Sequence, residues 1–240
     1  MSAKGSSAVM PEKAQVMVFT PHADDAEGGV GGTVIHWIRE GKDVIYVVCT
    51  NGDKGTNDPN MKPEELVKIR EEEQLAAAKV LGVREVIFLR YPDQGLEDTP
   101  EFRKEIVRLI RKYRPDTVVT ADPYRRYLWH RDHRITGQAV LDAVFPYARD
   151  LHAYPDLLEE GFQPHRVTEV LLWGTEEPNY HSDITDVFDI KVAALSCHKS
   201  QVGNNPSHDL EERVRQRGRM HAEGQDFELA EAFHRVELRW

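Results

Sequence analysis

One imidazole and two carboxylates stand close together near the start of the chain, as His22, Asp24 and Asp25. Neutral imidazole and carboxylate groups are ligands of Zn²⁺ and Fe²⁺ in proteins. Because neighbouring side chains of an extended segment point in different directions, one aspartate can bind a metal ion while the other faces a water molecule. Alone, the Asp-Asp pair is more typical of a polar turn at the start of a helix, so metal chemistry requires further ligands.

A second cluster offers such ligands about a hundred residues later, where His130 and His133 flank Asp132. These side chains are both metal ligands and groups that transfer protons near neutral pH. Alone, this cluster is equally consistent with a charged surface loop. If the two clusters lie on one edge of one sheet, metal binding or catalysis becomes the favoured interpretation.

Each cluster follows a short apolar run that is typical of a buried strand, Val16–Phe19 before the first and Asp116–Thr120 before the second. Further strands are expected at residues 44–49, 86–89, 170–173 and 234–240, and helices at 33–38, 63–82, 102–110, from Ile135, 187–199 and 211–221, the last as a solvated helix. This alternation predicts an α/β fold, a Rossmann-like, doubly wound, mostly parallel sheet with helices on both faces. Ligands of such folds bind at the carboxyl ends of the strands, where both clusters are expected.

Composition limits the class of protein. With 240 residues, of which 40% are hydrophobic, the chain suits a single domain over residues 15–240, after a disordered leader at residues 1–14. A net charge of −10 argues against nucleic-acid and anionic-membrane partners, because phosphate groups would be repelled. No apolar run reaches the length of a transmembrane helix. Two cysteines, Cys49 and Cys197, exclude a disulfide framework and suit the reducing cytoplasm.

The two clusters together resemble the motifs of the LmbE-like, or PIG-L, family of zinc-dependent N-acetylglucosamine deacetylases. The first family motif, His-Pro-Asp-Asp-Glu, is similar to residues 22–25, with Ala23 in place of proline and the acid arriving later, at Glu27. The second motif, His-x-Asp-His, matches residues 130–133. Weaker matches extend the resemblance from about Val16 to Gln201 and lie at Arg70 and Glu73, 93–95, 184–185, Lys191 and 198–201. The stretch at residues 174–180 looks most like members that act on small amino sugars, including diacetylchitobiose.

The resemblance implies one Zn²⁺ per chain, with Fe²⁺ or another divalent metal as the alternative. Its ligands would be His22, Asp25 and His133. Asp24 would be the general base. His130 would protonate the leaving amine or stabilise the oxyanion, with Asp132 tuning its charge.

The resemblance also implies that Arg70 and Asp93 contact the sugar. A tyrosine that assists catalysis in some members would stand two residues before His130, but this chain has Leu128 there and Tyr127 beside it, so a role for tyrosine stays open. Members of the family are often homo-oligomers, and a trimer or hexamer is therefore expected.

The predicted function is the metal-dependent hydrolysis of the N-acetyl group of a small N-acetylglucosamine-type substrate, which gives a free amine and acetate. A metal-dependent phosphoesterase is an alternative, since histidines and aspartates also build such sites. A non-catalytic nucleotide- or sugar-binding module is another. Residues 29–34 contain two glycines of a dinucleotide-binding fingerprint but have Val34 in place of the third, which is weak support.

Overall fold

The computed structural model describes residues 13–127, 129–203 and 208–239. Residues 1–12 of the expected leader lie outside the described residues. Ala14, at the end of that leader, is buried, and its backbone N–H donates to the carbonyl of Tyr113 at 2.9 Å.

A seven-stranded sheet with the strand order β3-β2-β1-β4-β5-β7-β6 forms the centre of the molecule. The strands are β1 Val16–Thr20, β2 Val44–Thr50, β3 Glu85–Tyr91, β4 Thr117–Ala121, β5 Glu169–Trp173, β6 Tyr180–Asp183 and β7 Ala230–Glu237. Strands β1 to β5 pair in parallel, whereas β7 is antiparallel to both β5 and β6. The predicted mostly parallel α/β sheet is thus confirmed.

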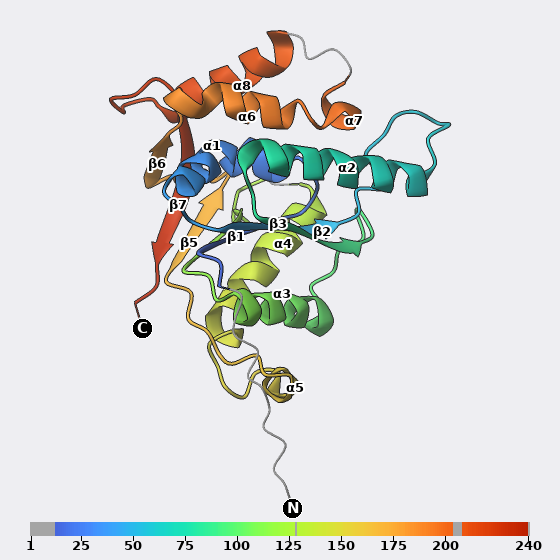
Figure 1. The fold of residues 1–240 in the computed structure, drawn as a ribbon, viewed down its shortest axis with the longest axis vertical. Coiled ribbons are helices and arrows are strands. Elements are labelled where there is room, and N and C mark those ends of the chain that lie inside the picture. Colours follow the sequence, from blue (N-terminus) through green and yellow to red (C-terminus); the bar gives the residue numbers. More distant parts are fainter. Residues whose placement is uncertain (1–12, 128, 204–207, 240) are drawn as a thin grey trace, which may run out of the picture.

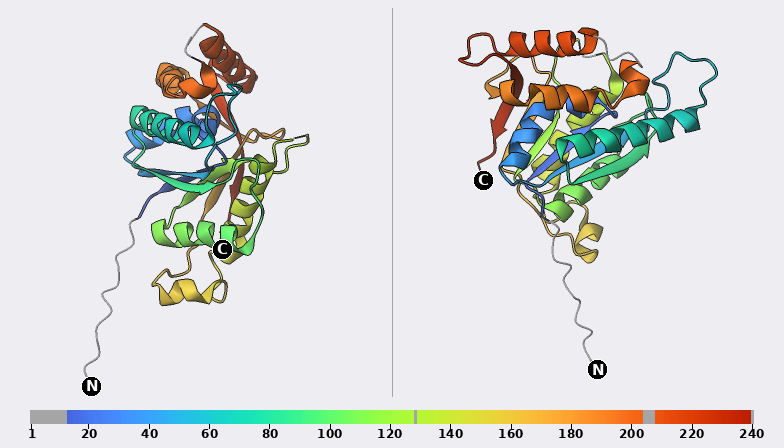
Figure 2. Two further views of the ribbon diagram at one scale, coloured as in Figure 1. Left: turned by 90° about the vertical axis from the view of Figure 1, so that its right-hand side faces the viewer. Right: turned by 45° about the horizontal axis from the view of Figure 1, so that its top comes forward.

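Helices cover both faces of the sheet (Figure 1; Figure 2). On one face α1 Asp25–Arg39 and α2 Pro63–Leu81 cover the sheet, and α6 Phe188–Leu195 packs on these two helices from outside. Helix α8 His208–His221 lies on α6, and the short α7 Lys199–Val202 follows α6. The other carries α3 Pro100–Tyr113 and α4 Arg131–Asp142, which continues into an irregular helical turn, Ala143–Tyr147. The remaining short elements are α5 Pro155–Glu159 and a 3₁₀ turn, Thr185–Val187.

The alternation of side chains along β1 explains the two-layer core. Met17 and Phe19 are buried against the α3 and α4 side, and Val16 and Val18 against the α1 and α2 side. A parallel strand that is covered on both faces reads as a continuous apolar run, because each side chain faces a layer of helices. This is the pattern from which the strand was predicted.

Several elements differ from the sequence-based expectation. Helix α1 starts at Asp25 rather than at Thr33, and β7 spans Ala230–Glu237 rather than residues 234–240. Strand β6 was not predicted, because its sequence, Tyr-His-Ser-Asp, contains no apolar run. The expected helix at residues 187–199 is divided into α6 and α7. Helix α8 is not solvated all round, because Leu210 and Gly218 are buried.

The sheet order places the loops after β1 and β4 side by side. Strand β1 pairs with β2 on one side and with β4 on the other, so the chain reverses its winding direction there. The crevice at such a switch point is the usual ligand site of open α/β sheets. No helix among the described residues is long and apolar enough to cross a membrane.

Candidate metal centre and active site

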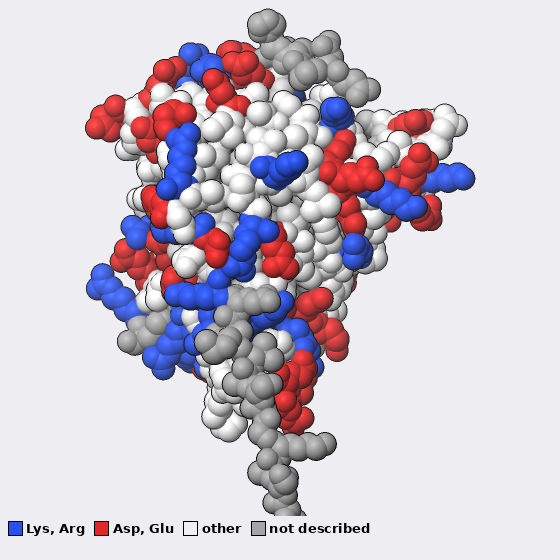
Figure 3. Space-filling model, in the orientation of Figure 1, with Lys and Arg blue, Asp and Glu red and all other residues white. Residues whose placement is uncertain are grey.

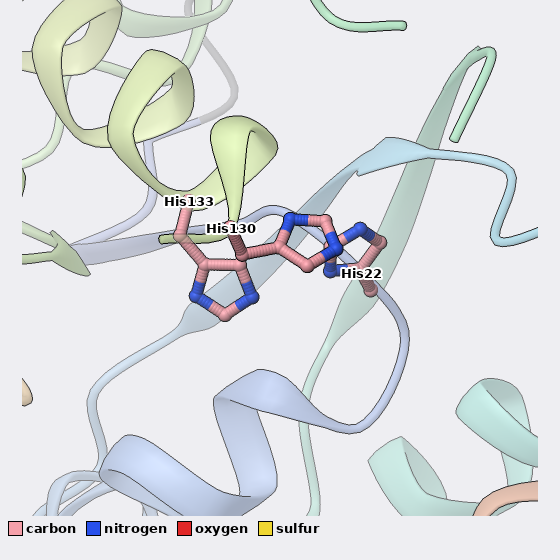
Figure 4. Close-up of side chains that lie close together, drawn as sticks. All are labelled: His22, His130 and His133. Atoms are coloured by element: carbon pink, nitrogen blue, oxygen red, sulfur yellow. The ribbon is translucent and has the colours of Figure 1, made fainter. Parts of the chain in front are cut away.

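The two sequence clusters meet at the carboxyl edge of the sheet (Figure 4). His22 comes from the loop after β1, and His130 and His133 from the entry into α4. The ring centroid of His22 lies 4.6 Å from that of His130 and 5.3 Å from that of His133. Helix α4 starts at Arg131, earlier than expected, and so brings His133 into its first turn. The shared sheet edge therefore brings together side chains that are about a hundred residues apart.

One carboxylate oxygen joins the two clusters. The Oδ2 atom of Asp25 lies 3.1 Å from Nδ1 of His22 and 3.3 Å from Nε2 of His133. Asp25 is the first residue of α1 and is anchored there, because its Oδ2 also accepts the backbone N–H of His22. The three metal ligands that the family resemblance implies, His22, Asp25 and His133, are thus linked through this one oxygen.

The second ring nitrogen of His22 is held by two further carboxylates. Nε2 lies 3.1 Å from Oδ1 of Asp93 and 3.2 Å from Oδ2 of Asp132. Asp132 is fully buried and accepts the backbone N–H groups of Gln94 at 2.7 Å and Leu96 at 3.3 Å. Partners of this kind fix the ring orientation of metal-binding histidines. Asp132 was expected to tune the charge of His130, and its negative charge does act to raise the pKa of His130, while its side-chain hydrogen bond goes to His22.

The charge around His22 favours a bound cation. Burial disfavours the charged imidazole, but hydrogen bonds to three carboxylates, that of Asp132 first, outweigh it and raise the pKa of His22 to about 11. The potential ligand atoms of His22, His130 and His133 all lie within 4.8 Å of one another, as do those of a second group, His22, Asp93, His130 and Asp132. Nitrogen and oxygen donors at this density fit a divalent first-row metal ion.

Asp24 stands beside this centre with its carboxylate partly exposed. Burial, followed by the negative charge of Asp25, raises the pKa of Asp24 to about 7, although the positive charge of Arg70 opposes the shift. Such a carboxyl group can accept a proton near neutral pH.

His130 lies on the solvent side of the centre and is exposed. Burial of part of its ring, together with the positive charges of His22 and His133, lowers the pKa of His130. Its position above His22 suits a group that exchanges protons with a bound molecule.

The two residues expected to contact a sugar, Arg70 and Asp93, are both buried. The guanidinium group of Arg70 donates to the carbonyl oxygens of Ala23 at 2.7 Å and Gly52 at 3.3 Å. The carboxylate of Asp93 contacts His22 and accepts the backbone N–H of Lys54. Their contacts support the loops of the site, and a contact with a sugar stays a prediction.

A catalytic role for a tyrosine beside His130 stays a prediction. Tyr127 is exposed, with a backbone φ of 60°, and Leu128 lies outside the described residues.

A cavity of about 590 Å³ opens beside the metal centre. Asp24, Asp25 and His133 line one end, and Arg217 and His221 of α8 line another part. Pockets for small ligands have this size. The contribution of α8 had no signal in the sequence, because its charged pattern is also that of a solvated helix.

The glycine run after the first cluster serves close packing. A Cβ atom on Gly29 would lie 2.6 Å from the ring of Trp173 on β5, and one on Gly32 would lie 2.5 Å from Ile184. Helix α1 therefore approaches its neighbours closely, which explains these glycines without a bound dinucleotide.

Comparisons with known proteins agree with this arrangement. A family model described as PIG-L, GlcNAc-PI de-N-acetylase, matches residues 17–144. A diacetylchitobiose deacetylase of Thermococcus kodakarensis is 38% identical over 187 residues, which cover 78% of this chain and 70% of that protein. A probable N-acetyl-alpha-D-glucosaminyl L-malate deacetylase 2 of Bacillus anthracis is 28% identical over 197 residues, covering 80% of this chain and 83% of that protein.

A solved structure is also similar. The N,N'-diacetylchitobiose deacetylase of Pyrococcus horikoshii, in complex with its inhibitor MPG, superposes with a TM-score of 0.89 at 32% sequence identity. The match covers 93% of this chain and 84% of that chain. The similarity thus includes the late elements of the chain, beyond the residues that the family model matches.

Proposed function

The chain belongs to the PIG-L family, and on that premise we propose that it hydrolyses the N-acetyl group of a small N-acetylglucosamine-type substrate to a free amine and acetate. The observation that carries this proposal is the contact of Asp25 Oδ2 with both His22 and His133, next to Asp24 at the end of a cavity. A metal-binding group, a separate carboxylate base and an open space for substrate are the parts that such a hydrolysis needs.

Deacetylases of this family are metal-dependent, and we propose Zn²⁺ for this chain. We place it at His22, Asp25 and His133, a set supported by the contacts of Asp25 with both histidines, whereas the two closest groups of potential ligand atoms contain His130 and not Asp25. Fe²⁺ or another divalent metal is the alternative that the same donors accept. When bound there, Zn²⁺ supplies Lewis acidity, which polarises an amide carbonyl and makes water more acidic. Asp93 and Asp132 hold His22 from behind through its other ring nitrogen.

The protein side chains then divide the proton transfers. Asp24 takes a proton from the attacking water molecule, since its carboxylate lies beside the centre and lines the cavity. The ionised form of this carboxyl group is the one that acts as a base, and a cation held at His22, Asp25 and His133 would favour it. His130 gives a proton to the departing amine, because an amine leaves readily only when it is protonated. The acetyl group leaves as acetate.

The volume of the cavity limits the size of the substrate. The cavity has room for an amino sugar carrying a second residue, which supports a disaccharide of the diacetylchitobiose type or a comparable conjugate. The face in Figure 3 carries both acidic and basic side chains around a largely uncharged middle, and the net charge of −10 disfavours a phosphate backbone as partner. We also propose a cytoplasmic homo-oligomer, trimer or hexamer. The two free cysteines support the reducing compartment, and native mass measurement tests the assembly.

The test is a panel of N-acetylglucosamine, diacetylchitobiose and N-acetylglucosaminyl malate, assayed for amine and acetate with and without a chelator. We expect activity on at least one of them, loss with the chelator, and recovery on addition of Zn²⁺ or Fe²⁺. The same preparations are assayed for phosphate release from a simple phosphate ester. Phosphate release without amine release would contradict the deacetylase and favour the phosphoesterase.

A variant tests the role of Asp24. Asp24→Asn should retain the metal but lose at least about a hundredfold in kcat, the scale of general base catalysis. Asp43→Asn, at an exposed aspartate that pairs with Arg84, is the matched control and should leave kcat unchanged. Undiminished turnover of Asp24→Asn would remove Asp24 from the mechanism.

A further inference from the structure

Two side chains of α2 hold both polar groups of the peptide unit that joins Ala23 to Asp24. Arg70 Nη2 donates to the carbonyl oxygen of Ala23 at 2.7 Å, and the N–H of Asp24 donates to Oε1 of Gln74 at 3.2 Å. Arg70 and Gln74 are four residues apart, and side chains at this spacing lie on the same face of a helix. Both are buried. Two side chains on one turn of α2 therefore fix the peptide unit that precedes Asp24, the proposed general base.

Asp24 has a backbone conformation that is unusual for a residue other than glycine. Asp24 has φ 92° and ψ −28°, in the left-handed region that residues other than glycine rarely adopt. Such a conformation persists only where surrounding contacts enforce it, and it is characteristic of functional sites. Because the backbone sets the direction in which the Asp24 side chain leaves the chain, the contacts to this peptide also set the position of its carboxylate.

The orientation of Gln74 is itself fixed. Its Nε2 atom donates to Oε1 of Glu27 at 2.7 Å, so its Oε1 atom is the one that faces the N–H of Asp24. On the far side of Glu27, Nε2 of His198 lies 3.3 Å from Oε2. Glu27, Gln74 and His198 are each 0% exposed. A carboxylate accepts hydrogen bonds and cannot donate them. Glu27 must therefore face the amide nitrogen of Gln74, which leaves the amide oxygen of Gln74 to accept the N–H of Asp24.

We propose that Gln74, oriented by Glu27 and backed by His198, is a positioning residue that holds the peptide of Asp24 in its left-handed conformation and so aims the catalytic carboxylate. The inference rests on the proposed function for its catalytic consequence. Its structural part, a clamp on one peptide unit, is independent of the reaction. None of the three residues needs to touch the substrate.

The first readout is kinetic. Gln74→Leu keeps the size of the side chain but cannot accept the N–H of Asp24, and it should lower kcat at least tenfold with KM and metal content unchanged, because small displacements of a catalytic group have large effects on rate. Gln74→Asn keeps the amide but is one methylene shorter, and it serves if the leucine variant does not fold. Leu81→Ala is the matched control, since Leu81 is buried at the far end of the same helix. It should lose stability without this selective loss of kcat.

The second readout is independent of activity. Hydrogen exchange, followed in peptides that span residues 20–30, should be faster in Gln74→Leu than in the wild type, and this segment should be affected more than the rest of the core. Leu81→Ala, which lowers global stability, should speed exchange in this segment no more than elsewhere in the core. A kcat of the Gln74 variants within twofold of Leu81→Ala, or unchanged exchange of this segment, would overturn the clamp. If the wild type shows no deacetylase activity on the panel, the proposed function fails, and the exchange result alone decides for or against the clamp.

Discussion

The Nζ atom of Lys191 lies 2.5 Å from Oε1 of Glu231, and both side chains are almost entirely buried, at 4% and 3% exposure. Lys191 also donates to the carbonyl of Gly28 at 2.9 Å. The Glu231 carboxylate accepts the N–H groups of Gly32 and Thr33, each at 2.8 Å. This ion pair therefore joins α6 and β7 to the helix that starts at the metal centre.

Breaking this pair should destabilise the fold strongly. Lys191→Met leaves the Glu231 carboxylate buried without its cation, and removal of one partner of a buried pair costs about 3–5 kcal/mol. Denaturant unfolding measures the loss. Asp186→Asn, which breaks the exposed pair with Arg39, is the control and should change stability by no more than about 1 kcal/mol. Equal effects of the two substitutions would contradict the structural role of the buried pair.

Replacing Asp132 should weaken the metal centre without touching the proposed ligands. In Asp132→Asn the side chain keeps its size but loses the charge that faces Nε2 of His22. Loss of such a partner typically lowers metal affinity or activity about 10- to 100-fold. Metal titration and kcat are the measurements. Asp142→Asn, at the other end of α4, should leave both unchanged, and an unaffected metal affinity of Asp132→Asn would show that His22 does not depend on this carboxylate.

The sequence was sufficient to predict six of the seven strands and the meeting of the two clusters. Strands β1 and β4 are apolar runs that are buried on both faces, and each is followed directly by ligand-type residues. Neighbouring parallel strands end at one edge, so the proximity of His22 and His133 follows from strand order. The apolar runs of β1 and β4 and their central place in the sheet therefore agree.

The supports of the site were less predictable, because they depend on contacts between distant segments. Gln74 directly follows three consecutive glutamates in α2. It is buried because the loop after β1 packs against it. The effect of Asp132 on the charge of His130, its near neighbour in sequence, was expected, but its hydrogen bond to His22, 110 residues away, was not. The only local signal for Gln74 was its spacing of four residues from Arg70.

Two neighbouring glycines of α1 should respond in opposite ways to alanine. In Gly29→Ala the new Cβ would lie 2.6 Å from the ring of Trp173, and overpacking of this kind costs about 1–3 kcal/mol. In Gly28→Ala the new Cβ has no described atom within 4 Å, outside its own helix and neighbours, and should stabilise the helix by about 0.5–1 kcal/mol. Thermal unfolding of both variants measures the difference. A stabilised Gly29→Ala would show that α1 is not packed closely on β5.

The thiols of Cys49 and Cys197 should differ in reactivity. Because Cys49 lies on β2, its labelling shows whether that strand opens to solvent. Burial raises the pKa of Cys49 to about 12 from a usual value of 9.0, so at pH 8.5 its thiolate, the reactive form, is almost absent. Burial also raises the pKa of Cys197, but this thiol is only half-buried and stays accessible to a reagent. An aromatic disulfide reagent should therefore label Cys197 in the folded chain and reach Cys49 only after unfolding in denaturant. In Cys197→Ser, the folded chain should release no reagent chromophore. Rapid labelling of Cys49 in that variant would mean that β2 opens to solvent without global unfolding.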